Sequence, residues 1–299
     1  MRLAGLELGG TKCIAVLSDG LIITERLEIP TSTPGETLAA ALEVLCEWDA
    51  AAPLAAIGVA SFGPVQVDRA AADFGRILTT PKKGWSGADL LGPLRERFAC
   101  PLGLDTDVNA AALAEYRWGT GQGCSSLVYL TIGTGVGGGI VIDGRPIHGM
   151  LHPELGHLQF RRAEGDRFSG ICPFHDDCIE GLISGPALTA RFSGDIHAAP
   201  ADDPRRDHLA ADLAQLFATL ILSVSPHKIL VGGGVGLGLP GLLDTAIVKL
   251  PAILSGYLPQ LDAAALCAMI GPPGLGADAG PLGTIALASN AVADRQTAG

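Results

Sequence analysis

The sequence is poor in charged residues, and in basic residues most of all. Only 17% of its 299 residues are charged, and 20 Lys and Arg stand against 31 Asp and Glu, a formal net charge of −11. Disordered chains combine few apolar with many charged residues, so we expect this chain to bury a substantial core. No long basic run occurs. That argues against nucleic acid or an anionic membrane surface as a partner.

Membrane and export signals are also lacking. No uninterrupted apolar run reaches the length of a membrane span. Residues 3–10, LAGLELGG, already have the pattern of a strand and a glycine turn, so we expect no signal peptide. Five of the seven cysteines are scattered, and their odd number favours reduced thiols over a disulfide framework. We therefore expect a soluble cytoplasmic protein.

Two familiar nucleotide-binding patterns are absent, the Walker loop and a dinucleotide fingerprint that opens a helix. Three other glycine turns follow predicted strands instead. Backbone N–H groups in such turns can cradle phosphate, and a threonine or lysine adds a donor. Any one of them could be a plain tight turn, but three together favour phosphate binding. They lie at Gly9-Gly10-Thr11-Lys12, at Gly133–Gly139 with Thr131 before it, and at Gly232–Gly236.

The hydrophobic pattern predicts an α/β protein built from a repeated unit. A strand, a glycine turn, a second strand and an Asp-Gly turn occur in that order twice, ending at Asp19-Gly20 and at Asp143-Gly144. This repeat predicts a duplicated domain. We expect strands at 3–8, 13–17, 21–29, 56–60, 102–104, 126–132, 140–142, 228–231 and 265–270, and helices at 34–48, 109–118, 209–224 and 283–293.

The domain boundary is predicted where the first Ala-rich helix ends. We expect a small α/β domain over residues 1–115, joined by the C-terminal helix 284–299. A larger α/β domain would then cover residues 116–283 and carry a zinc-binding loop at 152–180.

A cluster of soft ligands lies inside that loop. His157 is followed by Cys172, His175 and Cys178, an order that fits one tetrahedral zinc ion. The alternative is ordinary thiols and polar side chains, and His152 is a rival ligand to His157. Four protein ligands close the coordination shell, so we expect structural rather than catalytic zinc. Two carboxylates, Glu154 and Glu180, flank the cluster.

Acidic residues also stand where a predicted strand meets a helix. Transfer of a phosphoryl group to a hydroxyl needs a carboxylate that accepts the proton, and Asp107 is a candidate. Helix N-capping is the competing interpretation. We favour capping for Asp105, and for Asp107 the spacing leaves the choice open.

Taken together these motifs resemble the ROK family of sugar kinases, repressors and related proteins. The resemblance covers almost the whole chain. It includes GGTK at 9–12, TDVNAAALAE at 106–115, TIGTGVGGG at 131–139, ELGH at 154–157, the cysteine knot and VGGGVG at 231–236. It implies a two-domain actin-like ATPase (ribonuclease H-like) fold with a cleft between domains. It also implies phosphorylation of a hexose by ATP with Mg²⁺, structural Zn²⁺, and a homodimer.

The resemblance further implies roles for individual residues. Asp107 matches the catalytic base, while Glu154, His157 and Glu180 match residues that hold sugar hydroxyls. Gly63, Pro64, Thr106 and Asn109 fall on the sugar side. The nucleotide side comprises Gly9, Gly10, Thr11, Lys12, Thr131, Gly133, Thr134, Gly135, Gly185, Pro186, Gly232, Gly233 and Gly234, and the metal ligands are His157, Cys172, His175 and Cys178.

Within the family the chain is most similar to bacterial fructokinases. SFGP at 61–64, TPKKGW at 80–85, CPFHDDC at 172–178 and Glu7 in place of the usual Asp carry that similarity. Thr106 replaces the Asn of many glucokinases, which makes glucose a weaker expectation than fructose. The alternatives are a mannokinase or glucokinase of broad specificity, a sugar-sensing repressor, for which we expect no N-terminal DNA-binding motif, and a zinc hydrolase, which would need an open metal position.

Overall fold

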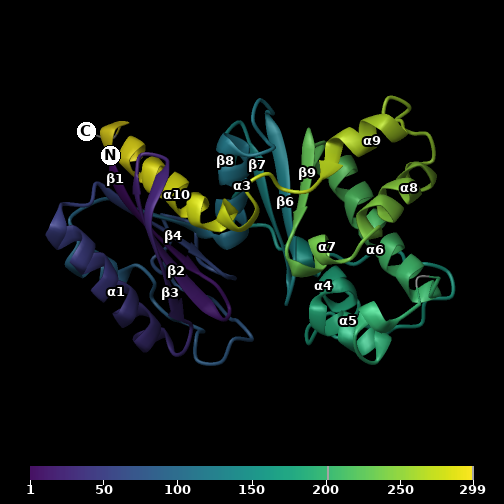
Figure 1. The fold of residues 1–299 in the computed structure, drawn as a ribbon, viewed down its shortest axis with the longest axis horizontal. Helices are drawn as coiled ribbons and strands as arrows, with labels where there is room; N and C mark the ends of the chain where they lie inside the picture. The colour runs from purple at the N-terminus through teal and green to yellow at the C-terminus, as the bar shows by residue number, and fades with distance from the viewer. Residues whose placement is uncertain (201, 298–299) are drawn as a thin grey trace. The chain divides into compact units, whose positions relative to one another are not determined.

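Strand β1 (Arg2–Leu8) pairs with a strand on each side. The computed structural model describes residues 1–200 and 202–297, and in it β1 is the middle strand of a five-stranded sheet (Figure 1). The order is β3 (Ile22–Pro30), β2 (Lys12–Asp19), β1, β4 (Ala56–Ser61) and β5 (Leu102–Thr106). β2 and β3 are antiparallel neighbours, whereas β4 and β5 run parallel to β1.

A second sheet repeats this order. It comprises β10 (Ile270–Gly271), β9 (Lys228–Gly232), β6 (Ser126–Ile132), β7 (Val136–Ile142) and β8 (Arg145–Pro146). β6 is antiparallel to β7 and parallel to β9, as β1 is to β2 and β4. The equal order and directions support the duplication that the sequence predicted.

Helix α1 (Pro34–Ala51) and helix α10 (Ala279–Thr297) cover opposite faces of the first sheet (Figure 1). Alternate residues of β1 divide between them, because successive strand side chains point to opposite faces. Leu6 packs in the cluster that contains α1 residues, whereas Leu3 packs with Ile285 of α10.

Helix α10 lies against a row of glycines. Gly5, Gly58 and Gly103 are in register across β1, β4 and β5. A Cβ on Gly58 would overlap the carbonyl oxygen of Thr284, and one on Gly103 would overlap that of Leu287. Any larger residue in this row would therefore push the terminal helix off the sheet.

Two more helices, α2 (Gly92–Arg97) and α3 (Asp107–Trp118), lie in the chain before the second sheet begins. The second half carries α4 (Ile179–Ile183), α5 (Gly185–Phe192), α6 (Pro204–Val224), α7 (Gly234–Gly238), α8 (Leu242–Leu254) and α9 (Ala263–Met269), and short 3₁₀ turns lie at Leu155–His157, Ile196–Ala198 and Gly276–Asp278. Residues 265–270 were expected as a strand, and that expectation was wrong. Asp262 caps α9 by accepting from the Ala265 N–H, and only two residues of strand follow.

Helix α6 is apolar enough to raise the question of a membrane. Among the described residues it is the one helix long and apolar enough to cross a membrane, but 56% of its apolar stretch is buried. It packs along α8, and Arg191 of α5 forms a buried ion pair with Asp212 of α6 at 3.0 Å. These are the contacts of a core helix.

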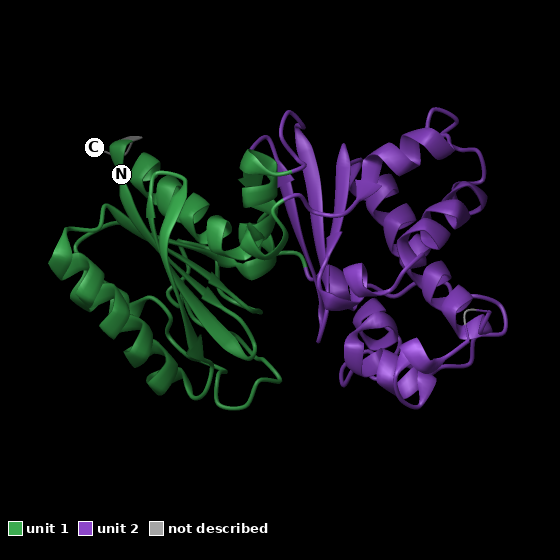
Figure 2. Ribbon diagram, viewed as in Figure 1, with its two compact units in different colours: residues 1–119, 145–153, 275–299 green, residues 120–144, 154–274 purple. Residues whose placement is uncertain are grey.

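The chain divides into two compact units. Unit 1 comprises residues 1–119, 145–153 and 275–299, and unit 2 comprises residues 120–144 and 154–274 (Figure 2). Residues 145–153 were predicted in the second domain, but they fall in unit 1. His148 bonds to Asp105, and the Val65 N–H donates to His152, which ties this segment to unit 1.

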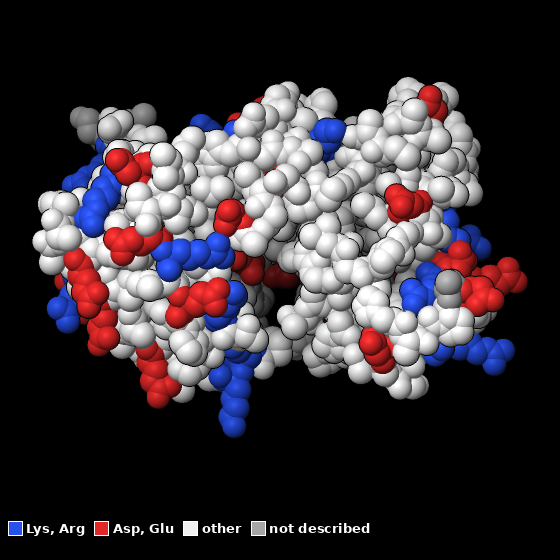
Figure 3. Space-filling model, viewed as in Figure 1, with Lys and Arg blue, Asp and Glu red and all other residues white. Residues whose placement is uncertain are grey.

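On the face drawn in Figure 3, Lys and Arg side chains are interspersed with Asp and Glu. That face therefore carries no continuous basic stripe.

Candidate functional site

Asp107 occupies the first position of helix α3, directly after strand β5. The N-cap is Thr106, whose hydroxyl accepts from the Asn109 N–H at 3.1 Å. Asp107 Oδ1 accepts from the Val108 N–H at 2.8 Å, where the positive end of the helix favours a carboxylate. The cap is therefore neither Asp105, as we expected, nor Asp107. Asp107 is partly exposed, and helix capping does not account for an acid at the first position of α3.

Asp105 instead anchors a polar network beneath α3. Its carboxylate is 2% exposed and accepts from the Thr106 N–H at 2.8 Å and from Asn109 Nδ2 at 2.7 Å. His148 Nε2 lies 3.0 Å from its second oxygen, and this hydrogen bond raises the pKa of His148. Asn109 is only 1% exposed, and its Oδ1 has no partner among the described residues. Thr106 and Asn109 are thus shown as buried supports of the helix start.

His152 supports the SFGP loop rather than a metal. Its Nε2 accepts from the Val65 N–H, at 3.1 Å, directly after Gly63 and Pro64. Burial lowers the pKa of His152, which keeps the ring neutral and able to accept. This bond removes His152 as a rival to His157.

Glu7, which the sequence marked only as a replacement for the usual Asp, is a largely buried acid in the structure. It lies on the α10 face of β1, and a Cβ on Gly280 would overlap its carboxylate, so Glu7 reaches the start of α10. Burial first, and the charge of Asp107 second, raise the pKa of Glu7 to about 7. Its Oε2 is buried without a hydrogen-bond partner in the described ranges. A carboxyl that titrates near neutrality therefore stands beside Asp107.

The first glycine turn, Gly9 to Lys12, joins β1 to β2. The Gly9 N–H donates to the Lys12 carbonyl at 2.9 Å, while Gly10 and Thr11 are exposed. Lys12 pairs with Glu28 at 2.6 Å. A second cation reaches the turn, because Lys82 donates to the Gly10 carbonyl. In the sequence Lys82 belongs to the TPKKGW motif, and nothing in that motif indicates a contact with Gly10.

The second glycine turn joins β6, which contains Thr131, to β7. The Gly133 N–H donates to the Gly135 carbonyl at 2.9 Å, with Thr134 between them. The Val136 N–H donates to Glu180 Oε2 at 3.0 Å, and a Cβ on Gly135 would come within 2.7 Å of the same oxygen. Glu180 therefore lies directly against this turn.

The remaining predicted nucleotide residues stand at helix starts in unit 2. Gly185 and Pro186 open α5, and the Gly185 N–H donates to the Gly133 carbonyl at 2.7 Å. The third glycine turn, Gly232-Gly233-Gly234, joins β9 to α7. Gly233 has a φ of +84°, and a Cβ there would crowd the Ile132 backbone, so glycine is required.

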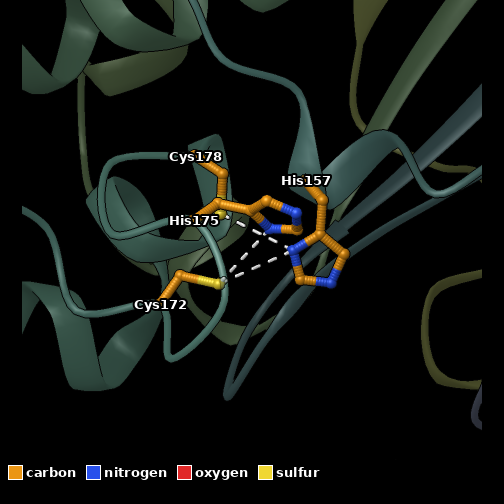
Figure 4. A group of neighbouring side chains, drawn as sticks. All are labelled: His157, Cys172, His175 and Cys178. Carbon is orange, nitrogen blue, oxygen red and sulfur yellow. Dashed lines mark hydrogen bonds between the residues drawn. The ribbon is translucent and has the colours of Figure 1, made fainter. Parts of the chain in front are cut away.

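The four predicted metal ligands lie together. Their ligand atoms are all within 4.8 Å of one another (Figure 4). Cys172 Sγ is 3.8 Å from Nδ1 of both His157 and His175, and Cys178 Sγ is 3.6 Å from His157 Nδ1. In a tetrahedral zinc site with ordinary bond lengths, nitrogen and sulfur ligands are separated by about 3.6 Å. The donor set and its spacing fit zinc.

The loop that carries these ligands is held by its backbone. Cys172 and Asp176 exchange two N–H···O bonds of 3.1 and 3.0 Å, which closes a tight turn around His175. Both cysteines are buried, while His175 is exposed and His157 is half-buried. His157 also lies next to Gly156, where a Cβ would overlap the Val136 carbonyl, so the ELGH segment packs closely on β7.

The charge of one flanking carboxylate affects the other. Partial desolvation, and then the charge of Glu180, raise the pKa of Glu154 to about 7, although Glu154 keeps an exposed surface. Unit 2 thus holds Glu154, His157 and Glu180 around one loop, whereas Asp107 belongs to unit 1.

Known proteins resemble this chain in sequence and in structure. The ROK family model matches residues 3–291. A putative fructokinase of Bacillus subtilis (strain 168) is 40% identical, covering 97% of this chain and 96% of its own. A Zymomonas mobilis fructokinase is 40% identical over 95% of each chain. Among solved structures, a ROK hexokinase from Thermus thermophilus has a TM-score of 0.80 at 30% identity, covering 98% of this chain and 100% of its own. A Streptomyces griseus ROK glucokinase in complex with glucose and AMPPNP has a TM-score of 0.75 at 25% identity, covering 97% and 100%.

Proposed function

The chain belongs to the ROK family, with its actin-like two-domain fold, and from that premise we propose that it is an ATP-dependent fructokinase. It transfers the γ-phosphoryl group of MgATP to D-fructose and releases fructose 6-phosphate and ADP. Fructokinases 34–40% identical over most of this chain support the substrate. Mg²⁺ arrives with the nucleotide and offsets charge on its phosphates.

Asp107 is the proposed general base. Its carboxylate accepts the proton of the attacking sugar hydroxyl, whose oxygen then forms a bond to the γ-phosphorus. The bond from that phosphorus to the bridging oxygen breaks, and ADP leaves with the electron pair. The observation that carries this proposal is the position of Asp107. It lies at the start of α3, and the Val108 N–H orients its carboxylate. Thr106 caps the helix, so Asp107 does not serve as the N-cap.

The proposed sugar-binding residues of unit 2 are Glu154, His157 and Glu180. Carboxylates accept hydrogen bonds from hydroxyl groups, and an imidazole N–H donates one. His157 turns Nδ1 toward the cysteine sulfurs, so its Nε2 would carry the proton and donate. Direct sugar contact by Gly63, Pro64, Thr106 and Asn109 stays a prediction, and Thr106 and Asn109 would act from buried positions.

The glycine turns provide the proposed nucleotide site. Backbone N–H groups at Gly9–Lys12 and at Gly133–Gly135 suit phosphate oxygens, and the turn at Gly232–Gly234 suits the adenosine. Lys82 is added to this set, because it already reaches the Gly10 carbonyl. A lysine at that position brings a positive charge toward a turn that binds phosphate.

Structural Zn²⁺ completes the proposal. His157, Cys172, His175 and Cys178 supply four ligands, and bound zinc would order a loop that carries sugar ligands. Metal analysis of the purified protein should find one zinc per chain. Chelation should lower its thermal stability.

An ADP-release assay over fructose, mannose and glucose tests the function. Fructose should give the highest kcat/KM, and Asp107→Asn should lower kcat by about 10³-fold while fructose binding persists. Equal turnover of all three sugars would instead favour the hexokinase alternative, which the T. thermophilus relative supports. Near-normal activity of Asp107→Asn would remove Asp107 from its role.

We also propose a cytoplasmic location and a homodimer. All seven cysteines are unpaired, as a reducing compartment requires. The dimer rests on the family resemblance, and sedimentation analysis of the purified protein will give the subunit number.

A further inference from the structure

Helix α4 (Ile179–Ile183) lies between two parts of unit 2 with different proposed ligands. It follows the metal ligand Cys178 directly, and it precedes Gly185, a residue of the proposed nucleotide side. With only five residues it contains little more than one turn. A displacement at one end is therefore passed to the other.

Three contacts join α4 to the metal-binding loop. The Ile179 N–H donates to the Leu158 carbonyl at 2.9 Å, and the Gly181 carbonyl accepts from the Ile171 N–H at 3.1 Å. A Cβ on Gly181 would overlap the Asp176 carbonyl, so the loop backbone presses on the helix. The position of α4 therefore depends on how the loop between Cys172 and Cys178 is closed.

Glu180 of α4 and Gly185, the first residue of α5, both contact the glycine turn at Gly133–Val136. Glu180 Oε2 accepts from the Val136 N–H at 3.0 Å, and it stands so close to Gly135 that a Cβ there would come within 2.7 Å. The Gly185 N–H donates to the Gly133 carbonyl at 2.7 Å. The carboxylate thus fixes one backbone N–H of the turn, and the turn has no side chain at Gly135 to hold its own shape.

We propose that Glu180 is a positioning residue for the Gly133–Val136 turn, through which the state of the Cys172–Cys178 loop controls the affinity for ATP. This role is additional to sugar binding and rests on the proposed kinase function. Zinc would hold the loop, the loop holds α4, and Glu180 holds the turn. Metal occupancy then matters to the nucleotide as well as to the sugar.

The first test measures AMPPNP binding with Mg²⁺ and without sugar, so that a role of Glu180 in sugar binding cannot contribute. Loss of one hydrogen bond to a charged acceptor should make Glu180→Ala bind on the order of tenfold more weakly than wild type. Glu180→Gln keeps an acceptor for the Val136 N–H and should recover most of the affinity. Glu164→Ala removes the same charge from an exposed position of the same unit and should bind as wild type does.

The second test repeats these titrations after zinc has been removed and Mg²⁺ restored, with circular dichroism to follow folding. Zinc removal should weaken AMPPNP binding to wild type and to Glu164→Ala, but have little further effect on Glu180→Ala, because residues that act in series are not additive. An equal loss in all three proteins would overturn the coupling through Glu180. If the zinc-free protein unfolds, the comparison of Glu180→Ala with Glu164→Ala in the zinc-loaded state decides whether Glu180 positions the turn for AMPPNP.

The two proposals fail differently. Failure of wild type to bind AMPPNP would contradict the kinase function itself. Wild-type affinity in Glu180→Ala would contradict only the role of Glu180.

Discussion

Glu7 offers a quantitative prediction, because a buried carboxyl beside a second acid should make the protein less stable as pH rises. Burial, and then Asp107, raise the pKa of Glu7 from 4.5 to about 7. The folded state therefore holds this proton more tightly than the unfolded state does. Between these two pKa values each rise in pH favours unfolding, and above about pH 7 the penalty is complete.

The size of the penalty follows from the shift. A change from 4.5 to about 7 corresponds to about 3 kcal/mol in the free energy of unfolding. Glu7→Gln keeps the shape and removes the charge, so near pH 8 it should stabilise the protein by up to that amount. At a pH well below 4.5, where both states are protonated, it should change stability little.

Urea denaturation at a series of pH values measures this difference. Glu43→Gln on α1, an exposed position of the same unit, is the matched control and should shift the midpoint by the same small amount at every pH. Asp107→Asn should move the Glu7 transition part of the way toward lower pH, because it removes the second cause of the raised pKa. A difference between Glu7→Gln and wild type that does not change with pH would refute the reasoning.

Three further predictions concern the frame of unit 1, and urea denaturation measures each. Gly58→Ala forces a Cβ onto the Thr284 carbonyl and should cost about 3 kcal/mol, so an unchanged midpoint would show that α10 yields easily. Asp105→Asn breaks the pairing with partly exposed His148 and should cost about 1–2 kcal/mol. The pKa of His148 is raised in the folded protein, so the ion pair stabilises the protein fully below pH 6.5, and its effect is lost as pH rises through the pKa of the folded state. A cost of Asp105→Asn that is the same in acid and in alkali would contradict this. Thr106→Val should lose about 1 kcal/mol of helix capping while Thr106→Ser should not, and equal stabilities would remove Thr106 as the cap.

Local patterns predicted the parts of the fold that depend on short stretches of chain. The strands of the first glycine-turn unit and helices α1 and α3 were expected within about three residues of their observed bounds. Strand β7 begins at Val136, four residues earlier than expected and inside the predicted glycine turn, and α6 begins at Pro204, five residues earlier than expected. Helix α8 was not expected, although it is thirteen residues long. It begins after Pro240 and Gly241 and contains Pro251 near its end, so turn signals surround an otherwise apolar helix.

In the candidate site, too, local spacing predicted some features, whereas contacts between distant residues could not be predicted. The spacing of Cys172, His175 and Cys178 predicted the cluster, because all three lie within one turn of loop. The contacts of Lys82 with Gly10, and of Glu180 with Val136, join residues about 72 and 44 positions apart, and no local pattern encodes them. Glu7 was noted only as a replacement for the usual Asp, since its raised pKa arises from burial and from the charge of Asp107, which depend on the fold.

The capping ambiguity shows what a structure adds to a motif. From the sequence, capping was weighed for Asp105 and Asp107, and Thr106 was not considered as the N-cap. In the structure Thr106 is the N-cap and Asp105 belongs to the buried polar network. Asp107 neither caps the helix nor belongs to that network.

The central claim is that Asp107 accepts a proton from fructose during phosphoryl transfer from ATP. Its most direct test is the rate of fructose-dependent ADP release by Asp107→Asn, measured beside wild type at saturating MgATP and fructose. The account predicts a loss of about 10³-fold in kcat with fructose affinity kept within a few fold. A variant that retains most of its kcat, or a wild type that releases no ADP with fructose, would contradict it.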